Sequence, residues 1–309
     1  MTAGAGLALQ ARLNGELGSR VGDGIASTLA STLVGLVLLL VFVPVLPAGR
    51  RGLGLIRTAV RTGGVRWWHL AGGVCGALFV AGQGISVGSV GVAMFTVAAV
   101  GGSAVGGLVV DRFSNGPGGQ RPITVARTAG AVACVAAVAV AGHDAWDSPG
   151  TLALVVLPVL AGAAVAVQSA LNGRVGAAAR SPWPPTLINF TVAAVSLALA
   201  LAIRVALGWD PPGRLPAEPP LYLAGVIGIG VIAVATVPVR HIGVLVFGLA
   251  SVTGQLLGAV ALDALTPGPR LSSATFVGVA ITFLALVLAA HPRFQRAEPA
   301  PPSARGADD

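Results

Sequence analysis

"LQARLNG", residues 9–15, and "VQSALNG", residues 167–173, are nearly the same phrase, written 158 positions apart. Each copy places a glutamine and an asparagine four residues apart among small and apolar neighbours, Gln10 with Asn14 and Gln168 with Asn172. Residues four apart share one face of a helix, so each copy predicts a helix with a polar amide face. A polar motif that returns at a fixed offset indicates a chain built from two similar halves.

A second group of matches supports this duplication. The matching residues follow the motif in the same order at an offset of 152, namely Gly91, Gly102, Gly106 and Asp111, then Gly243, Gly254, Gly258 and Asp263. A change in loop length accounts for the smaller offset. We therefore assign residues 1–145 to a first repeat and residues 146–292 to a second. The polar, Pro- and Ala-rich residues 293–309 are predicted to be a disordered tail.

The composition places both halves in a membrane. Of the 309 residues, 55% are hydrophobic and 10% are charged, and the mean hydropathy is +0.86. A soluble domain carries about 25% charged residues, so this chain could not cover a water-exposed surface. The net charge of +8 does not indicate nucleic-acid binding, because the arginines fall in short segments between apolar runs without an aromatic face.

Apolar runs long enough to cross a bilayer recur along the whole chain. A hydrocarbon core of about 30 Å requires roughly 20 residues of helix, and only helices or closed barrels satisfy their backbone in lipid. The predicted spans cover residues 1–18, 25–46, 67–87, 90–110, 122–142, 151–172, 184–207, 220–238, 242–262 and 272–291. We expect an all-α membrane protein with ten transmembrane helices, five in each half.

Arginines are unevenly distributed over the predicted connections. If the N-terminus is cytoplasmic, 14 of the 19 arginines fall on the cytoplasmic side, as the positive-inside rule requires. We expect a multi-pass protein of the cytoplasmic (inner or plasma) membrane with both termini and the tail inside. Because five is odd, the second repeat must enter the membrane from the opposite side. Inverted-topology repeats of this kind are a recurring design of secondary transporters.

The start of the first repeat is shorter than its counterpart. Nine residues precede Gln10, whereas about 17 residues separate Thr151 from Gln168 in the second repeat. We expect either a translation start upstream of Met1 or a first helix that begins inside the bilayer.

Polar residues inside the predicted spans are the candidates for a substrate path. They are Gln10, Asn14, Ser31, Gln83, Gln168, Asn172, Asn189 and Gln255. Ser31 and Asn189 are equivalent at the offset of 158. Amides buried in hydrocarbon need hydrogen-bond partners, which either a neighbouring helix or a solute in a cavity could supply. Both interpretations stay open at this point.

One carboxylate and two glycine pairs are further candidates. Glu16 is either half of an exposed pair with Arg12 or a carboxylate that couples transport to an ion. Small residues four apart permit close helix packing, either within the chain or across a homodimer. The residues with this spacing are Gly102 with Gly106 and Gly254 with Gly258.

The sequence holds no constellation that would support catalysis. It has no P-loop, no H-E-x-x-H and no acidic metal cluster, and its four histidines are dispersed near predicted helix ends. "GISVG", residues 84–88, matches the hydrolase elbow but lacks the strand that must precede it. We expect neither enzyme activity nor a metal or cofactor.

Three stretches carry a resemblance to a known family. They are "LQARLNGELG", residues 9–18, "GGLVVDRFSNGPGGQRPITVARTAG", residues 106–130, and "TGQLLGAVALDAL", residues 253–265. The chain resembles the drug/metabolite transporter superfamily, and within it the YdcZ-like branch in a duplicated five-helix form. Asp111 and Phe113 match the Asp-x-Phe that follows the fourth helix in that branch, whereas Ala264 and Leu265 follow Asp263 in the second half. The resemblance implies ten helices and a transport role, and it names no substrate.

We therefore expect a transporter that moves a small organic metabolite or drug-like solute by alternating access. The resemblance favours export. The expected partners are that solute and the lipid bilayer, without nucleic acid. A non-transporting membrane scaffold or assembly protein is the alternative, and a dry central axis with its polar residues bonded to one another would favour it.

Overall fold

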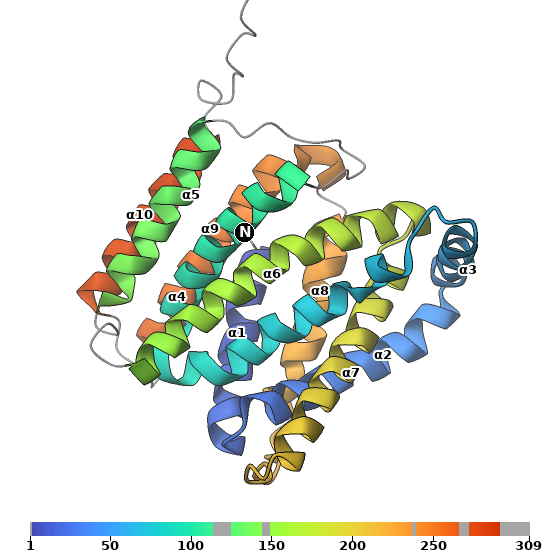
Figure 1. Ribbon diagram of the computed structural model, residues 1–309, viewed down its shortest axis with the longest axis horizontal. Helices are drawn as coiled ribbons and strands as arrows, with labels where there is room; N and C mark the ends of the chain where they lie inside the picture. The colour runs from blue at the N-terminus through green and yellow to red at the C-terminus, as the bar shows by residue number, and fades with distance from the viewer. Residues whose placement is uncertain (1, 114–124, 144–148, 237–238, 266–271, 291–309) are drawn as a thin grey trace, which may run out of the picture.

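The chain folds into a bundle of helices (Figure 1). The computed structural model describes residues 2–113, 125–143, 149–236, 239–265 and 272–290, and the tail predicted at 293–309 lies outside these ranges. The elements are α1 (Thr2–Val21), α2 (Gly24–Val45), α3 (Pro47–Arg61), the 3-10 helix η1 (Trp67–Ala71), α4 (Gly72–Phe113), α5 (Val125–Ala141), α6 (Pro149–Ala179), α7 (Trp183–Ala206), the 3-10 helix η3 (Pro219–Tyr222), α8 (Leu223–Thr236), α9 (Val239–Leu265) and α10 (Ser273–Ala290). No strand occurs within the described ranges, so the all-helical prediction is confirmed.

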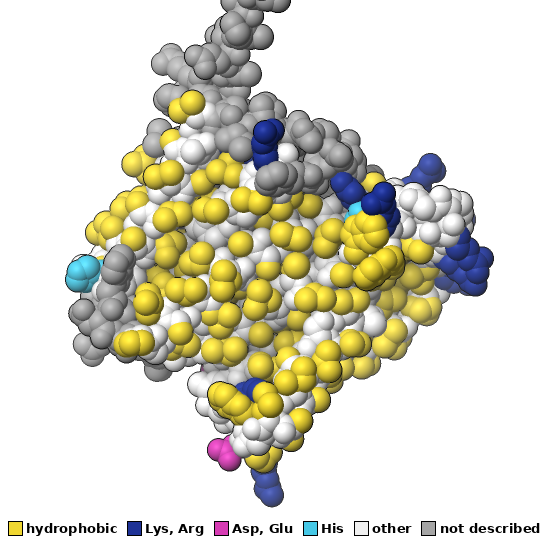
Figure 2. All heavy atoms as spheres, viewed as in Figure 1, with side chains coloured by type: hydrophobic (Ala, Val, Ile, Leu, Met, Phe, Trp, Pro, Cys, Tyr) yellow, Lys and Arg dark blue, Asp and Glu magenta, His cyan; other side chains and the backbone are white. Residues whose placement is uncertain are grey.

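The outside of the bundle is apolar. Within the described residues, four segments are long and apolar enough to cross a membrane: Gly24–Val45, Trp67–Arg112, Pro149–Ala179 and Trp183–Ala206. Large apolar side chains lie open on these helices, such as Phe42 of α2, which is 58% exposed. Figure 2 shows one broad apolar face with charged side chains toward its edges. A surface of this kind suits hydrocarbon rather than water.

Helix α4 consists of two arms that fold back on each other at Gly91. The rings of Phe79 and Phe95 lie 5.7 Å apart, centroid to centroid, whereas a straight helix would separate residues 16 apart by about 24 Å. Gly91 has φ +84°, a conformation that glycine adopts without strain. We call residues 72–90 the first arm and residues 92–113 the second arm. They correspond to the predicted spans 67–87 and 90–110.

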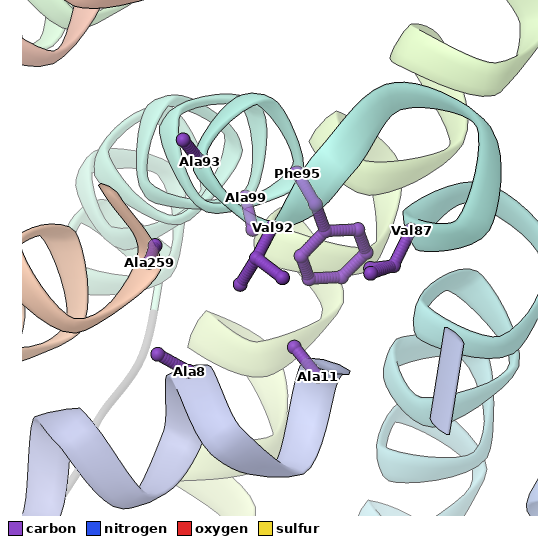
Figure 3. Packing of buried hydrophobic residues seen from close by; sticks show 8 residues of the cluster. All are labelled: Ala8, Ala11, Val87, Val92, Ala93, Phe95, Ala99 and Ala259. Carbon is purple, nitrogen blue, oxygen red and sulfur yellow. The ribbon is translucent and has the colours of Figure 1, made fainter. Parts of the chain in front are cut away.

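Small residues bring the two arms close to α1 and α9. The cluster in Figure 3 joins the side chains of Ala8, Ala11, Val87, Val92, Ala93, Phe95, Ala99 and Ala259. Most of these are alanine or valine, so the helix backbones approach closely. Asp263 of α9 fixes the turn between the arms, because its carboxylate accepts hydrogen bonds from the backbone N–H groups of Val92 (3.0 Å) and Ala93 (2.7 Å).

Asp23 connects the start of α2 to the end of α7. Its carboxylate accepts hydrogen bonds from the backbone N–H groups of Ile25 (2.9 Å) and Ala26 (3.0 Å), as an N-cap residue does. Its second oxygen lies 2.7 Å from the guanidinium of Arg204, and the Asp23 side chain is only 2% exposed. Arg20, three residues earlier, pairs with Glu16 and with Glu218. These ion pairs gather at one end of the bundle.

The opposite end is rich in arginine. The segment between the predicted spans 25–46 and 67–87 contains helix α3, which includes the arginine-rich residues 50–61. Gly52 and Ile56 of α3 are buried, and Gly52 packs against Pro184 at the start of α7. The exposed arginines of α3 and the following turn are Arg50, Arg51, Arg57, Arg61 and Arg66.

Helix crossings occur in equivalent pairs related by the two sequence offsets. A Cβ atom on Gly162 of α6 would lie 1.9 Å from the carbonyl oxygen of Ala99 in the second arm of α4. A Cβ atom on Gly4 of α1 would lie 1.8 Å from the carbonyl oxygen of Ser251 in α9. Gly4 and Gly162 differ by 158 positions, and Ala99 and Ser251 differ by 152. The two crossings are therefore copies of one another.

A second pair of crossings obeys the same offsets. A Cβ atom on Gly73 of the first arm would lie 2.4 Å from the carbonyl oxygen of Asn189 in α7. A Cβ atom on Gly225 of α8 would lie 1.9 Å from the carbonyl oxygen of Ser31 in α2. Only glycine permits such an approach. The contacts between helices thus repeat along with the sequence.

Candidate functional site

Three polar residues of the first half form a buried network. The Asn14 amide nitrogen donates a hydrogen bond to Gln83 Oε1 at 2.7 Å, and the Ser31 hydroxyl donates to Asn14 Oδ1 at 2.9 Å. Asn14 lies on α1 and is 1% exposed, Gln83 lies on the first arm of α4 and is 0% exposed, and Ser31 lies on α2 and is 2% exposed. We call Asn14, Ser31 and Gln83 the first amide cluster.

The candidates of the second half gather around the start of the first arm of α4. Gln168 Nε2 lies 3.5 Å from Asn189 Oδ1. A Cβ atom on Gly72 would lie 2.7 Å from Asn172 Oδ1 and 3.3 Å from Asn189 Oδ1, and one on Gly76 would lie 2.9 Å from Gln168 Nε2. Glycine at these two positions makes room for the amides. We call Gln168, Asn172 and Asn189 the second amide cluster.

The first arm of α4 links the two amide clusters. Gly72, Gly76 and Gln83 recur at helical spacing and so share one face of the arm. At 1.5 Å per residue, Gly72 and Gln83 are about 16 Å apart along the axis. Six of the eight substrate-path candidates belong to these two clusters. A seventh, Gln10, lies one helical turn from Asn14 on α1.

Gln10 lies where α1, α7 and α8 meet. A Cβ atom on Gly228 of α8 would lie 3.4 Å from Gln10 Oε1 and 3.5 Å from the ring of Phe190. Gly228 is the equivalent of Gly76 at the offset of 152, and Gln10 is the equivalent of Gln168 at 158. Sequence reasoning missed Gly76, Gly228 and Phe190. Extending the second offset backwards from Gly91 would have found the two glycines.

Several buried amide atoms have no partner. Gln10 Oε1, Gln83 Nε2 and Asn189 Nδ2 make no hydrogen bond within the described part of the chain. The three residues are 7%, 0% and 4% exposed. An unsatisfied buried polar group costs about 1–3 kcal/mol, and such groups call for a bound molecule or water. The hydrogen bonds among these buried amide residues therefore leave some of their polar atoms unsatisfied.

The two copies of the opening motif have unlike surroundings. Asn14 is 1% exposed, whereas its counterpart Asn172 is partly exposed. A Cβ atom on the buried Gly15 would lie 2.6 Å from the Val87 side chain. One on the exposed Gly173 would meet no atom of the described residues within 4 Å. The same motif is sealed in the first half and open in the second.

Backbone contact between glycines makes this seal. A Cβ atom on Gly18 of α1 would lie 2.0 Å from the carbonyl oxygen of Gly84, and one on Gly88 would lie 3.3 Å from the carbonyl oxygen of Gly15. At Gly176, the counterpart of Gly18, the nearest atom would be 4.0 Å away. We call Gly15, Gly18, Gly84 and Gly88 the glycine seal. At the offset of 152, Thr236 and Arg240 stand where the first arm has Gly84 and Gly88.

The glycine pairs predicted for packing lie at crossings inside the chain. A Cβ atom on Gly102 would lie 1.9 Å from the Val159 carbonyl oxygen of α6. Cβ atoms on Gly106 and Gly258 would lie 2.8 and 3.2 Å from backbone atoms of α6 and α1, respectively. Gly254 and its neighbour Gln255 are buried in α9. No hydrogen bond links the Gln255 side chain to either amide cluster within the described residues.

The candidate coupling acid lies away from the amide clusters. The Glu16 carboxylate pairs with Arg20, one turn further along α1, and its side chain is 31% exposed. The equivalent position at 158 is Arg174, whose guanidinium lies 3.0 Å from His69 Nε2. Over the described ranges, no group of three or more His, Cys, Asp or Glu residues could hold a metal ion.

Comparison with known proteins covers both halves. Residues 1–140 and residues 153–288 each match the family described as "Putative inner membrane exporter, YdcZ". No curated protein matches the chain. The two matches fall one within each predicted repeat, and they confirm the resemblance to the duplicated form. The chain belongs to this YdcZ family of drug/metabolite transporters.

Proposed function

We propose that the chain exports a small organic solute by alternating access between two inverted five-helix halves. The observation that carries this proposal is the unequal state of its repeated motif. Asn14 and Gly15 are sealed, whereas Asn172 and Gly173 are open. Alternating access requires two similar halves that adopt different packing, so that the protein opens first to one side and then to the other.

The equivalent crossings support the inverted repeat. The offsets of 158 and 152 convert the contact of Gly162 with Ala99 into that of Gly4 with Ser251. A pseudo-twofold relation between the halves produces such copies. If each arm of α4 is one span, each half holds five, and the second half then runs in the opposite direction. Helix α3 adds no span, since it carries exposed arginines along its length, and charged side chains are costly in hydrocarbon.

The charge distribution supports an orientation. The α3 end of the bundle carries five exposed arginines, whereas ion pairs such as Asp23 with Arg204 occupy the opposite end. By the positive-inside rule, we assign the α3 end and both termini to the cytoplasm. The glycine seal then closes the outer side, and the open stretch of α6 around Asn172 faces the cytoplasm.

This arrangement suggests a route for the solute. It would enter from the cytoplasm beside Asn172 and reach the second amide cluster. Gln10 and Gln83 would receive it next, further along the face of the first arm. Export then requires α1 and the first arm to part at the glycine seal while the open end of α6 closes.

The alternative, a non-transporting scaffold, fits the polar residues less well. A scaffold would gain stability from amides bonded to one another. Three buried atoms, on Gln10, Gln83 and Asn189, instead have no partner within the described residues. Leaving them unpaired costs free energy, so they favour a site that a solute completes.

Proteoliposome transport across a panel of metabolites tests the proposal. We expect Asn189→Ala and Asn172→Ala each to lower transport about tenfold, as loss of a hydrogen-bond partner for the solute does. Ser169→Ala is the matched control, because its exposed hydroxyl bonds only to its own helix, at Val165 O. Failure to move any solute would refute the proposed function. Transport rates in both asparagine variants equal to that of the parent protein would refute the proposed site.

A further inference from the structure

We propose that the exported solute is uncharged and polar, with groups that both donate and accept hydrogen bonds. This inference rests on the proposed function and assigns the class of substrate to the same site. The unpaired atoms include an acceptor, Gln10 Oε1, and two donors, Gln83 Nε2 and Asn189 Nδ2. A solute that meets these atoms in turn along the route needs at least one donor and one acceptor.

The hydrogen-bond network uses one end of the Gln83 amide and leaves the other end free. The Ser31 hydroxyl donates to Asn14 Oδ1, and the Asn14 amide nitrogen then donates to Gln83 Oε1. The Gln83 oxygen is thereby used, and its NH₂ group remains available as a donor. Because Gln83 is fully buried, water does not reach this group from outside in the present conformation.

Ionised side chains are bonded elsewhere. Within the described residues, no member of either amide cluster is bonded to a charged group. Glu16 pairs with Arg20, and Asp263 accepts hydrogen bonds from backbone N–H groups. Arg174, two residues beyond Asn172, is directed to His69. An ion taken from water into this site would lose its hydration without an ionised side chain bonded within the amide clusters to compensate, which disfavours binding.

The surroundings also limit the shape of the solute. The Phe190 ring and Gln10 Oε1 lie on the same side of Gly228, so the site has an apolar wall next to an acceptor. Gln168 contacts the first arm at Gly76, and Gln83 lies two helical turns further along the same arm, a distance of about 10 Å. A compact, partly planar molecule bearing amide or hydroxyl groups fits this spacing.

Flux measurements with matched solutes test the class. Proteoliposomes containing the full chain are assayed with neutral and ionised members of the same series. The series are uridine with its carboxylated analogue orotidine, and nicotinamide with nicotinate and 1-methylnicotinamide; empty liposomes correct for passive leak. We expect transport of the neutral members at least tenfold above that of their ionised counterparts.

Two substitutions connect this selectivity to the site. Asn189→Ala should lower flux of the neutral members about tenfold, whereas Asn189→Asp, of nearly the same shape, should also lower it but raise flux of the cationic member. Unchanged melting temperature and elution volume in detergent verify that the variants fold. Preferred transport of an ionised member, or unchanged selectivity in Asn189→Asp, overturns the substrate class but leaves the exporter intact. No flux of any solute overturns both.

Discussion

Substitution of Gly18 by alanine should open the glycine seal. The added Cβ atom would lie 2.0 Å from the Gly84 carbonyl oxygen, while real Cβ contacts are at least 3.0 Å. Helix α1 and the first arm of α4 must therefore separate by about 1 Å or more. Overpacking of this kind costs about 1–3 kcal/mol. The sealed conformation would lose that amount relative to the open one, a factor of roughly 5 to 150 in population.

The duplication supplies a matched control for this change. Gly176 is the counterpart of Gly18, and a Cβ atom there would have its nearest neighbour 4.0 Å away. Gly176→Ala should therefore leave the conformational balance unchanged. Both are alanine substitutions at equivalent helix positions, so a difference between them reports the seal and not helix propensity.

Thiol labelling measures the opening. Thr28 is fully buried, and its methyl group would lie 2.8 Å from a Cβ atom on Gly84. Thr28→Cys is thus a reporter in a chain whose two native cysteines, Cys75 and Cys134, are replaced by alanine. An impermeant maleimide should label it at least fivefold faster with Gly18→Ala than without. Equal labelling rates, or the same increase with Gly176→Ala, would refute the seal.

Three further changes have distinct expected results. Asp263→Ala removes the bonds to two N–H groups at the start of the second arm and should cost about 1 kcal/mol of stability, measured by thermal unfolding in detergent; an unchanged melting temperature would contradict the cap. Arg204→Gln leaves the buried carboxylate of Asp23 unpaired and should cost about 3 kcal/mol, whereas Arg20→Gln breaks an exposed pair and should cost less than about 1 kcal/mol; equal losses would argue against the buried pair. Asn14→Leu leaves the buried Gln83 Oε1 without its donor and should cost about 1–3 kcal/mol, and a neutral result in the same unfolding assay would contradict the network.

The sequence predicted the helices well because their physical causes are local. The length and apolar composition of a segment determine whether it can span the bilayer. The turn between the arms of α4 lies at Gly91, within a few residues of the boundary between the predicted spans 67–87 and 90–110. The repeated motif predicted two halves. Helix α3 was not predicted, because it packs against Pro184, and a partner that is distant in the sequence is not visible in a local pattern.

The sequence identified amides but not their partners. Asn14 bonds to Gln83, 69 positions away, and only the packing of α1 on the first arm brings them together. The difference in burial between the two motif copies could not be predicted either, since their sequences are nearly the same. The sequence differs at the equivalents of the first arm, where Thr236 and Arg240 replace Gly84 and Gly88 at the offset of 152.

Cysteine labelling in intact cells tests the inverted repeat most directly. Gly54 of α3 and Asp210, after α7, are exposed and lie in the equivalent connections of the two halves. In the cysteine-free chain, an impermeant reagent should label Asp210→Cys from outside and Gly54→Cys only after the membrane is permeabilised. Labelling of both positions from the same side would mean that the halves are parallel, and the proposed mechanism would be wrong.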